Sequence, residues 1–130
     1  MRPLYMVEQL QCESIYQDPA PYSQGRIHDG TVYLAGLDPV DETGEIVGDD
    51  IETQTTQTLR NVEELLAAAD SSCANIVSVT AYLIDRGDFA GFNRAFAAFL
   101  PDPKPARTTV VVDELVTDAK IELQVIAAQS

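Results

Sequence analysis

The sequence predicts an α+β domain in which two helices pack on one face of a mixed β-sheet. Three observations predict this: apolar runs of strand length, two segments with an apolar residue at every third or fourth position, and turn residues between them. The predicted order is β-β-α-β-α-β-β. With 130 residues, the chain suffices for a single domain, 1–130, and a domain of this size gains from a partner subunit.

The first third of the chain predicts a hairpin followed by a loop. Residues 31–35 form an apolar run, and residues 24–28 are its expected partner through the Asp29-Gly30 turn. Residues 1–23 are irregular and rich in proline, with a short strand near residues 4–8 left open. Residues 38–50 mix carboxylates with glycine and proline, which predicts a loop.

The clearest helix is predicted over residues 51–69. Asp49 or Asp50 is the expected N-cap, and Asp70-Ser71-Ser72 ends the segment. One apolar stripe recurs at intervals of three and four residues. Its members are Ile51, Thr55, Leu59, Val62, Leu66 and Ala69.

A buried strand and a second helix follow. Residues 76–84 are a β-branched run that predicts a strand covered on both faces. Asp88 is the expected cap of the second helix, which carries all four phenylalanines at helical spacing. We interpret those rings as core packing against the sheet. They are Phe89, Phe92, Phe96 and Phe99.

The last third predicts two strands joined by a turn, after a stiff proline-rich connector at residues 101–105. The strands are expected at 107–112 and 120–127, as an antiparallel hairpin turning near residues 115–116. In that hairpin Glu122 lies opposite Thr109 and shares a face with Arg107. On these grounds alone, Arg107 and Glu122 form a structural ion pair.

The charge balance excludes some partners. The chain has 21 Asp and Glu against 8 Lys and Arg, for a net charge of −13. Such a surface repels phosphate backbones and anionic headgroups, so neither nucleic acid nor a membrane surface is expected as a partner. Only Lys104 and Lys120 are lysines, which leaves two origins open, an ordinary acidic cytosolic protein and a protein adapted to concentrated salt.

Targeting signals and the usual catalytic motifs are missing from the sequence. No apolar core of a signal peptide follows residues 1–3, and no apolar run reaches the ~18 residues of a membrane span. Cys12 and Cys73 are too sparse for a disulfide framework, which favours a reduced, cytoplasmic protein. There is no phosphate loop, dinucleotide fingerprint or serine elbow. His28, the single histidine, is interpreted as a solvated turn residue, and one histidine makes no usual zinc site.

Eight motifs, in order, resemble the Rid (YjgF-type) family of reactive enamine/imine deaminases, over residues 19–127. They are Pro21-Tyr22-Ser23-Gln24-Gly25, Thr43-Gly44-Glu45, residues 54–61, Val79-Thr80-Ala81-Tyr82-Leu83, Asp88-Phe89, Asn93, Pro105-Ala106-Arg107-Thr108 and Lys120-Ile121-Glu122. The resemblance implies a fold like that of the trimeric chorismate mutases, with clefts between neighbouring subunits. It also implies hydrolysis of 2-aminoacrylate-type enamines, through their imines, to a 2-oxo acid and ammonia, with no cofactor or metal.

The resemblance assigns roles to individual residues. Arg107 matches the family arginine that grips the substrate carboxylate, and a planar bidentate guanidinium suits that task. Glu122 matches the glutamate that positions the attacking water. The backbone N–H of Thr109 is expected to hold substrate or water, and the ring of Tyr22 to form a pocket wall. Two further matches are Gly36, which permits close backbone approach to the ligand, and Asn93, with a structural or a site role.

Three departures from the family pattern leave the substrate open. Ala35-Gly36-Leu37 stands where archetypal members have Ser-Gly-Gln, Thr109 replaces a cysteine, and Asp70 replaces a glycine after the first helix.

The leading hypothesis is a 2-iminobutanoate/2-iminopropanoate-type deaminase. The alternatives are a non-catalytic trimeric protein that binds 2-oxo acids or related carboxylates, and a deaminase devoted to one pathway, for example on an aminomuconate-like substrate. Ribonuclease activity is disfavoured by the charge.

Overall fold

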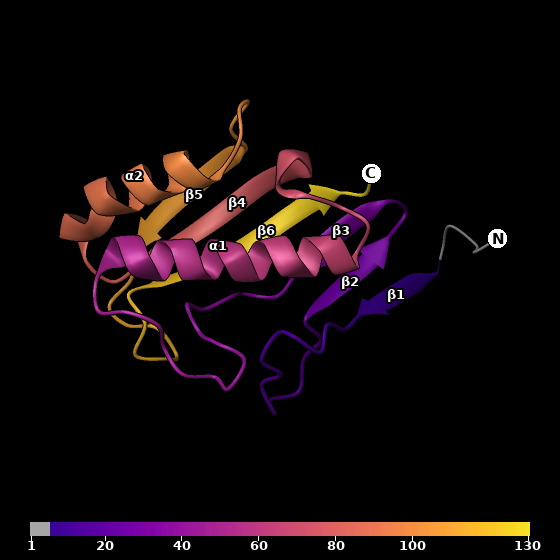
Figure 1. Ribbon diagram of the computed structural model, residues 1–130, viewed down its shortest axis with the longest axis horizontal. Helices are drawn as coiled ribbons and strands as arrows, with labels where there is room; N and C mark the ends of the chain where they lie inside the picture. Colours follow the sequence, from indigo (N-terminus) through magenta and orange to yellow (C-terminus); the bar gives the residue numbers. More distant parts are fainter. Residues whose placement is uncertain (1–5) are drawn as a thin grey trace.

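The computed structural model describes residues 6–130, which form one six-stranded sheet with two helices on one of its faces (Figure 1). The sheet order is β1-β2-β3-β6-β4-β5; β4 and β5 are parallel, and all other neighbours are antiparallel. This confirms the α+β class. The elements are β1 (Val7–Leu10), β2 (Gly25–His28), β3 (Thr31–Leu34), α1 (Ile51–Ala68), β4 (Ile76–Leu83), α2 (Phe89–Phe99), β5 (Ala106–Val111) and β6 (Ile121–Ala128), with short 3₁₀ turns at Cys73–Asn75 and Arg86–Asp88.

The predicted hairpin is confirmed as β2 and β3. Asp29 and Gly30 both have positive φ, 50° and 78°, which matches the twist that a two-residue hairpin turn requires. His28 ends β2 and is half-buried, so it belongs to the strand as well as to the turn. Of the strand expected near residues 4–8, residues 4 and 5 lie outside the described residues, and β1 runs from Val7 to Leu10.

The helix ends follow local hydrogen bonding. Asp50 caps α1, since its Oδ1 accepts the N–H of Thr53 at 2.7 Å. Asp70, just past the helix, has φ 57°, a left-handed conformation that aspartate tolerates. Asp88 occupies the N-cap position of α2, as predicted, but its side chain makes no cap hydrogen bond. Asp88 ends a 3₁₀ turn with φ −83° and ψ −7°, whereas a capping side chain acts from extended backbone.

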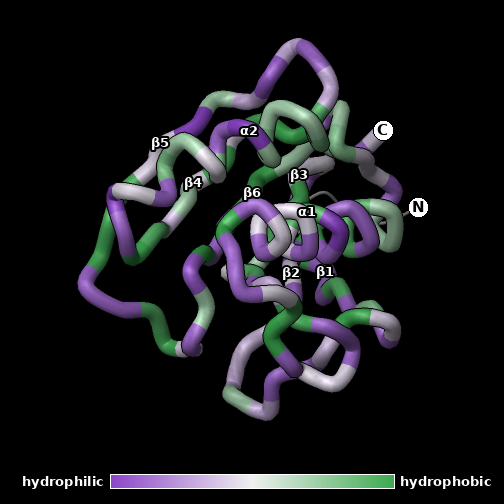
Figure 2. Tube along the Cα trace, turned by 60° about the vertical axis from the view of Figure 1, so that its left-hand side comes forward, coloured by the Kyte–Doolittle hydropathy of each residue, from purple (hydrophilic) through white to green (hydrophobic). Residues whose placement is uncertain are grey.

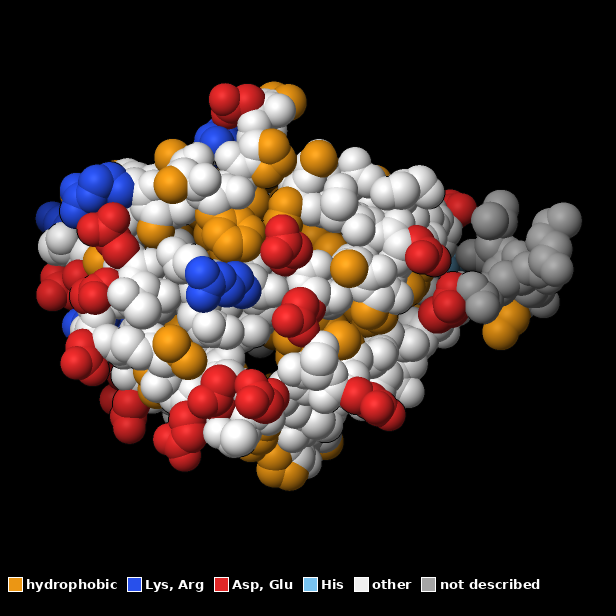
Figure 3. All heavy atoms as spheres, in the orientation of Figure 1, with side chains coloured by type: hydrophobic (Ala, Val, Ile, Leu, Met, Phe, Trp, Pro, Cys, Tyr) orange, Lys and Arg blue, Asp and Glu red, His pale blue; other side chains and the backbone are white. Residues whose placement is uncertain are grey.

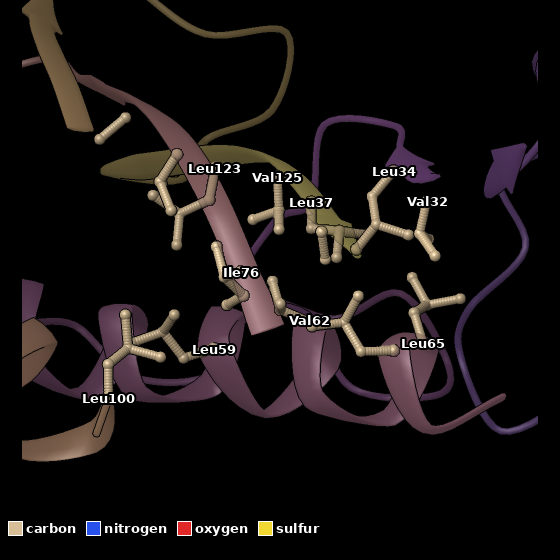
Figure 4. Packing of buried hydrophobic residues seen from close by; sticks show 14 of the residues in the cluster. Val32, Leu34, Leu37, Leu59, Val62, Leu65, Ile76, Leu100, Leu123 and Val125 are labelled. Carbon is tan, nitrogen blue, oxygen red and sulfur yellow. The ribbon is translucent and has the colours of Figure 1, made fainter. Parts of the chain in front are cut away.

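The core lies between the sheet and the two helices. Buried residues of β6 and β4 alternate with half-exposed ones and face the buried stripe of α1 (Figure 4). Figure 2 shows hydrophobic residues along β6 and neighbouring strands next to α1. Phe92 and Phe96 are buried, as predicted, whereas Phe89 is 44% exposed.

The prediction of a hairpin formed by the last two strands is wrong, because β4 lies between β5 and β6. The chain between β4 and β5 contains α2, and a strand–helix–strand connection within one sheet makes those strands parallel neighbours. The next strand, β6, then pairs with the other edge of β4 in the antiparallel sense. Arg107 is therefore in register with Val79, and Glu122 with Tyr82.

Within residues 6–130, neither helix has the length and apolar character needed to cross a bilayer. The acidic excess is visible on the helix-covered face, where carboxylates outnumber basic side chains (Figure 3).

Candidate active site

Arg107 and Glu122 lie on opposite faces of the sheet. Arg107 pairs with Val79, a buried core residue, so its side chain extends on the face that the helices cover. Glu122 alternates with the buried Ile121 and Leu123, so its carboxylate extends on the face without helices. The expected ion pair between them is therefore wrong within one chain.

The Arg107 guanidinium rests on aromatic rings of α2. Its central carbon lies 4.8 Å from the ring centre of Phe92, 4.9 Å from that of Phe96 and 5.7 Å from that of Phe89. Each contact is within the range of a cation–π interaction. Thus three phenylalanines predicted as core residues also hold this arginine in place.

Asn93 completes the support of Arg107, whose Nη2 donates a hydrogen bond of 2.8 Å to Asn93 Oδ1. No carboxylate among the described residues forms an ion pair with this guanidinium, and burial lowers its pKa below the ordinary value. Arg107, Asn93 and Lys104 line a cavity of about 430 Å³ together with Phe96, Ala97 and Pro105. Lys104 is already paired with Asp102 at 3.3 Å, so the cation that this cavity offers to an anionic group such as a carboxylate is Arg107.

Glu122 is positioned by a short bridge between the loop after β3 and strand β6. Leu37 and Leu123 exchange backbone hydrogen bonds of 2.8 and 3.0 Å. Both leucines are buried in the core, where Figure 4 shows them beside Val125. Next to this bridge Gly36 lies against the glutamate: a Cβ on Gly36 would stand 2.2 Å from Glu122 Oε2. The glycine therefore leaves room for the carboxylate itself.

A second cavity, of about 320 Å³, opens around Glu122. Tyr22 lines it and donates its hydroxyl to Asp18 Oδ2 at 3.1 Å. Burial raises the pKa of Glu122, and burial and the Asp18 hydrogen bond raise that of Tyr22 to about 12. The other residues that line this cavity are Asp18, Ala20, Ala35, Gly36, Asp38, Val116 and Thr117.

Asp38 is the residue of this cavity that sequence reasoning missed. Burial first, then the charges of Glu122 and Asp18, raise its pKa from 3.8 to about 6. Its Oδ1 is buried and has no hydrogen-bond partner in the part of the chain that the structure describes. The sequence places Asp38 in an acidic loop, and only the Leu37–Leu123 bridge brings it beside Glu122.

The structure thus brings the predicted site residues together as two groups. Arg107 and Asn93 form one, and Tyr22, Gly36 and Glu122 form the other. Thr109 follows Arg107 by two residues on the edge strand β5, and its half-buried side chain lies on the same face. Of the two departures near Gly36, Ala35 lines the Glu122 cavity, whereas Leu37 is directed into the core.

The chemistry available is that of an anion-binding cation in one cavity and a basic carboxylate in the other. A carboxylate with a raised pKa is a stronger base than an ordinary one and can accept a proton from water. Among residues 6–130, no three His, Cys, Asp or Glu side chains are arranged to hold a metal ion.

Known proteins match this chain over nearly its whole length. The family described as Endoribonuclease L-PSP matches residues 15–129. A RutC family protein of Pyrococcus horikoshii is 40% identical over 123 residues, which are 94% of this chain and 98% of the relative. Reactive Intermediate Deaminase A of Arabidopsis thaliana, a chloroplast protein, is 40% identical over 108 residues, 82% of this chain and 58% of the relative.

Solved structures agree with the sequence matches. The crystal structure of Escherichia coli TdcF with bound serine has a TM-score of 0.88 and 31% identity, covering 95% of this chain and 99% of TdcF. The resemblance drawn from the motifs is confirmed by these matches. The chain belongs to the Endoribonuclease L-PSP family, also called the YjgF or Rid family.

Proposed function

We propose that this protein is a cofactor-independent deaminase that hydrolyses reactive 2-imino acids of the 2-iminopropanoate and 2-iminobutanoate type to 2-oxo acids and ammonia. The observation that carries the proposal is the pair of uncompensated charges, the Arg107 guanidinium in one cavity and the Glu122 carboxylate in the other. A 2-imino acid presents a carboxylate to the first and an electrophilic carbon to water activated by the second. Two relatives support this class: one is named a reactive intermediate deaminase, and TdcF was crystallised with serine, a small ligand that carries a carboxylate.

Arg107 binds the substrate carboxylate in this proposal. Its guanidinium offers a planar fork of N–H donors, and Asn93 together with the rings of Phe92 and Phe96 fixes the plane of that fork. The main-chain N–H of Thr109 adds a donor that does not depend on its side chain.

Glu122 positions the water and accepts its proton as the oxygen bonds to the imine carbon. Its raised pKa favours this role, because a carboxylate whose pKa is higher than usual binds a proton more strongly and is a better base. Tyr22 forms a wall of the pocket, and Gly36 lets the carboxylate lie against the backbone.

The two groups act on one substrate only if a second copy of the chain contributes. Within one chain they lie on opposite faces of the sheet, so we propose a homotrimer in which Arg107 of one copy faces the Glu122 cavity of its neighbour. The charges support this arrangement, since no basic residue among residues 6–130 lines the Glu122 cavity. The helix-free face supports it as well, because Tyr33 is 44% and Val110 38% exposed on it.

The test uses 2-iminopropanoate generated in situ by an amino-acid oxidase and followed by semicarbazide trapping. The wild type should shorten the lifetime of the imine, and Arg107→Ala should abolish the effect. Arg60→Ala is the matched control, because it removes the same charge from an exposed position on α1. Failure to accelerate loss of any short-chain imino acid would contradict the proposal.

A second candidate is a trimeric protein that binds 2-oxo acids or related carboxylates without turnover. The observation that favours it is Ala35, which lines the Glu122 cavity where archetypal family members carry a serine hydroxyl. A rise in Tm with pyruvate, together with no imine hydrolysis, would support this candidate. Activity confined to one substrate, such as an aminomuconate-like imine, would instead indicate a pathway-specific deaminase.

We also propose a cytoplasmic location, which the free thiols of Cys12 and Cys73 support.

A further inference from the structure

We propose that Asp38 is a second catalytic carboxyl group in the Glu122 cavity, and that Asp38 and Glu122 hold one proton between them and move it during imine hydrolysis. The inference rests on the proposed deaminase function. It adds a residue to which neither the family pattern nor the motifs assign a role.

The backbone places the two carboxyl groups side by side. Leu37 and Leu123 form an antiparallel bridge through two mutual hydrogen bonds. In an antiparallel pair, the residue after one partner lies opposite the residue before the other, so Asp38 neighbours Glu122. Cross-strand neighbours have Cβ atoms about 4.5–5.5 Å apart, and like charges at such positions repel. The side chains of Leu37 and Leu123 point into the core. The carboxyl groups of Asp38 and Glu122 therefore point away from the core, into the 320 Å³ cavity that these two residues line.

Nothing in the described residues neutralises this pair. The titratable groups that face Asp38 are Glu122 on β6 and Asp18 in the segment before β2; Tyr22, also in that segment, gives its hydroxyl to Asp18. The loop between β5 and β6 contributes the uncharged Val116 and Thr117, and its one charged residue near the pair, Glu114, is a further carboxylate that lines an adjoining cavity with Glu122. On the α1 side, Asn61 Nδ2 donates a hydrogen bond of 3.1 Å to the backbone oxygen of Asp38 and none to its carboxyl group.

Two like charges in one partly buried cavity make the doubly ionised state unfavourable, so the pair retains one proton where isolated carboxyl groups have lost theirs. Asp38 is the group that keeps it, because its pKa rises to about 6. In the assembled site, the positive charge of Arg107 from a neighbouring copy would lower the pKa values of both Asp38 and Glu122. The carboxylate of the bound substrate offsets the charge of that arginine. The site then holds one base, Glu122, and one acid, Asp38.

The proton movements balance over the two steps. Glu122 takes a proton from water as the oxygen bonds to the imine carbon, and the electron pair of the C=N bond passes to nitrogen, which takes the proton of Asp38. The carbinolamine then collapses: Glu122 returns its proton to the nitrogen, ammonia leaves, and Asp38 accepts the hydroxyl proton as the C=O bond forms. Both carboxyl groups end in their starting states, and no further reactant is needed.

The experiment measures kcat for 2-iminopropanoate hydrolysis from pH 5 to 8.5 in wild type, Asp38→Asn and Asp38→Glu. Wild-type kcat should fall as pH rises through about 6, where Asp38 loses its proton. Asp38→Asn should lose that limb and at least about 100-fold in kcat, the usual contribution of general acid catalysis. Asp38→Glu should keep the limb and recover part of the rate. Asp49→Asn is the matched control, since it makes the same change at an exposed loop position.

The outcomes separate the two proposals. An active wild type whose rate and pH profile are unchanged by Asp38→Asn overturns this inference and leaves the deaminase function standing. A wild type inactive on every imino acid overturns both. If Asp38→Asn fails to fold, carbon-detected NMR titration of the wild type decides, because an Asp38 carboxyl group that titrates near its ordinary value of 3.8 overturns the inference.

Discussion

The Gly36→Ala variant should displace the Glu122 carboxylate without changing the carboxylate group itself, so it tests whether the position of this group matters for catalysis. The added Cβ would lie 2.2 Å from Oε2 and 2.9 Å from Cδ of Glu122, and ordinary contact begins at 3.4 Å. The carboxylate must therefore retreat by about 1.2 Å, and a misplacement of about 1 Å in a catalytic group costs on the order of 100-fold in rate. Gly36 has no positive φ, so alanine introduces no backbone strain. We expect kcat to fall about 100-fold with only a small change in Tm.

The assay is imine trapping with the oxidase-generated substrate, run beside thermal unfolding. Gly87→Ala is the control, because Gly87 also lacks a positive φ and the three atoms nearest to its added Cβ all belong to the exposed Asp85, the closest at 3.1 Å. If Gly36→Ala retains the wild-type kcat, the carboxylate beside Gly36 is not the group that activates water, and the assigned role of Glu122 fails.

The N-cap of α1, the Asp38 carboxyl group and the net charge of the chain each lead to a further expected outcome. Asp50→Ala removes the N-cap of α1, which should lower Tm by about 4 °C, measured by calorimetry; an unchanged Tm would contradict the capping role. Because the folded state raises the pKa of Asp38 from 3.8 to about 6, it binds this proton more tightly than the unfolded chain, so stability is lost as pH rises through that window. Asp38→Asn should therefore raise Tm at pH 8 and leave it unchanged at pH 3, and an equal effect at both pH values would refute the linkage. The net charge of −13 repels an anionic substrate, so KM should fall as NaCl is raised from 0.05 to 0.5 M with fold and assembly constant; a rise in KM would contradict this.

Local patterns in the sequence were sufficient for the elements of the fold. The Asp29-Gly30 turn, the apolar stripe of α1 and the Asp50 cap each depend on residues within a few positions of one another, and each is confirmed. The position of the Asp88 cap is also confirmed, but its side chain makes no capping hydrogen bond, because a 3₁₀ turn that hydrophobic periodicity does not reveal fixes its backbone.

Strand neighbours were harder to predict, since they depend on contacts between distant parts of the chain. The run from 107 to 127 has the form of a hairpin, yet α2 forces β5 to lie parallel to β4 and leaves the other edge of β4 to β6. This rearrangement moved Arg107 and Glu122 to opposite faces. The motif resemblance named both residues, but their separation and the presence of Asp38 emerge only with the sheet order and the Leu37–Leu123 bridge.

The central claim, that Arg107 and Glu122 of different copies form one site, is tested most directly by mixing two inactive variants. Arg107→Ala and Glu122→Gln should each be inactive alone. After the two are co-expressed in equal amounts and reassembled as mixed trimers, about a quarter of the sites should combine an intact arginine with an intact glutamate from neighbouring copies, so about a quarter of wild-type activity should return. If both residues act within one chain, no mixed assembly contains an intact site. Activity that stays at the level of the separate variants, in trimers verified to be mixed by native mass spectrometry, would contradict the account.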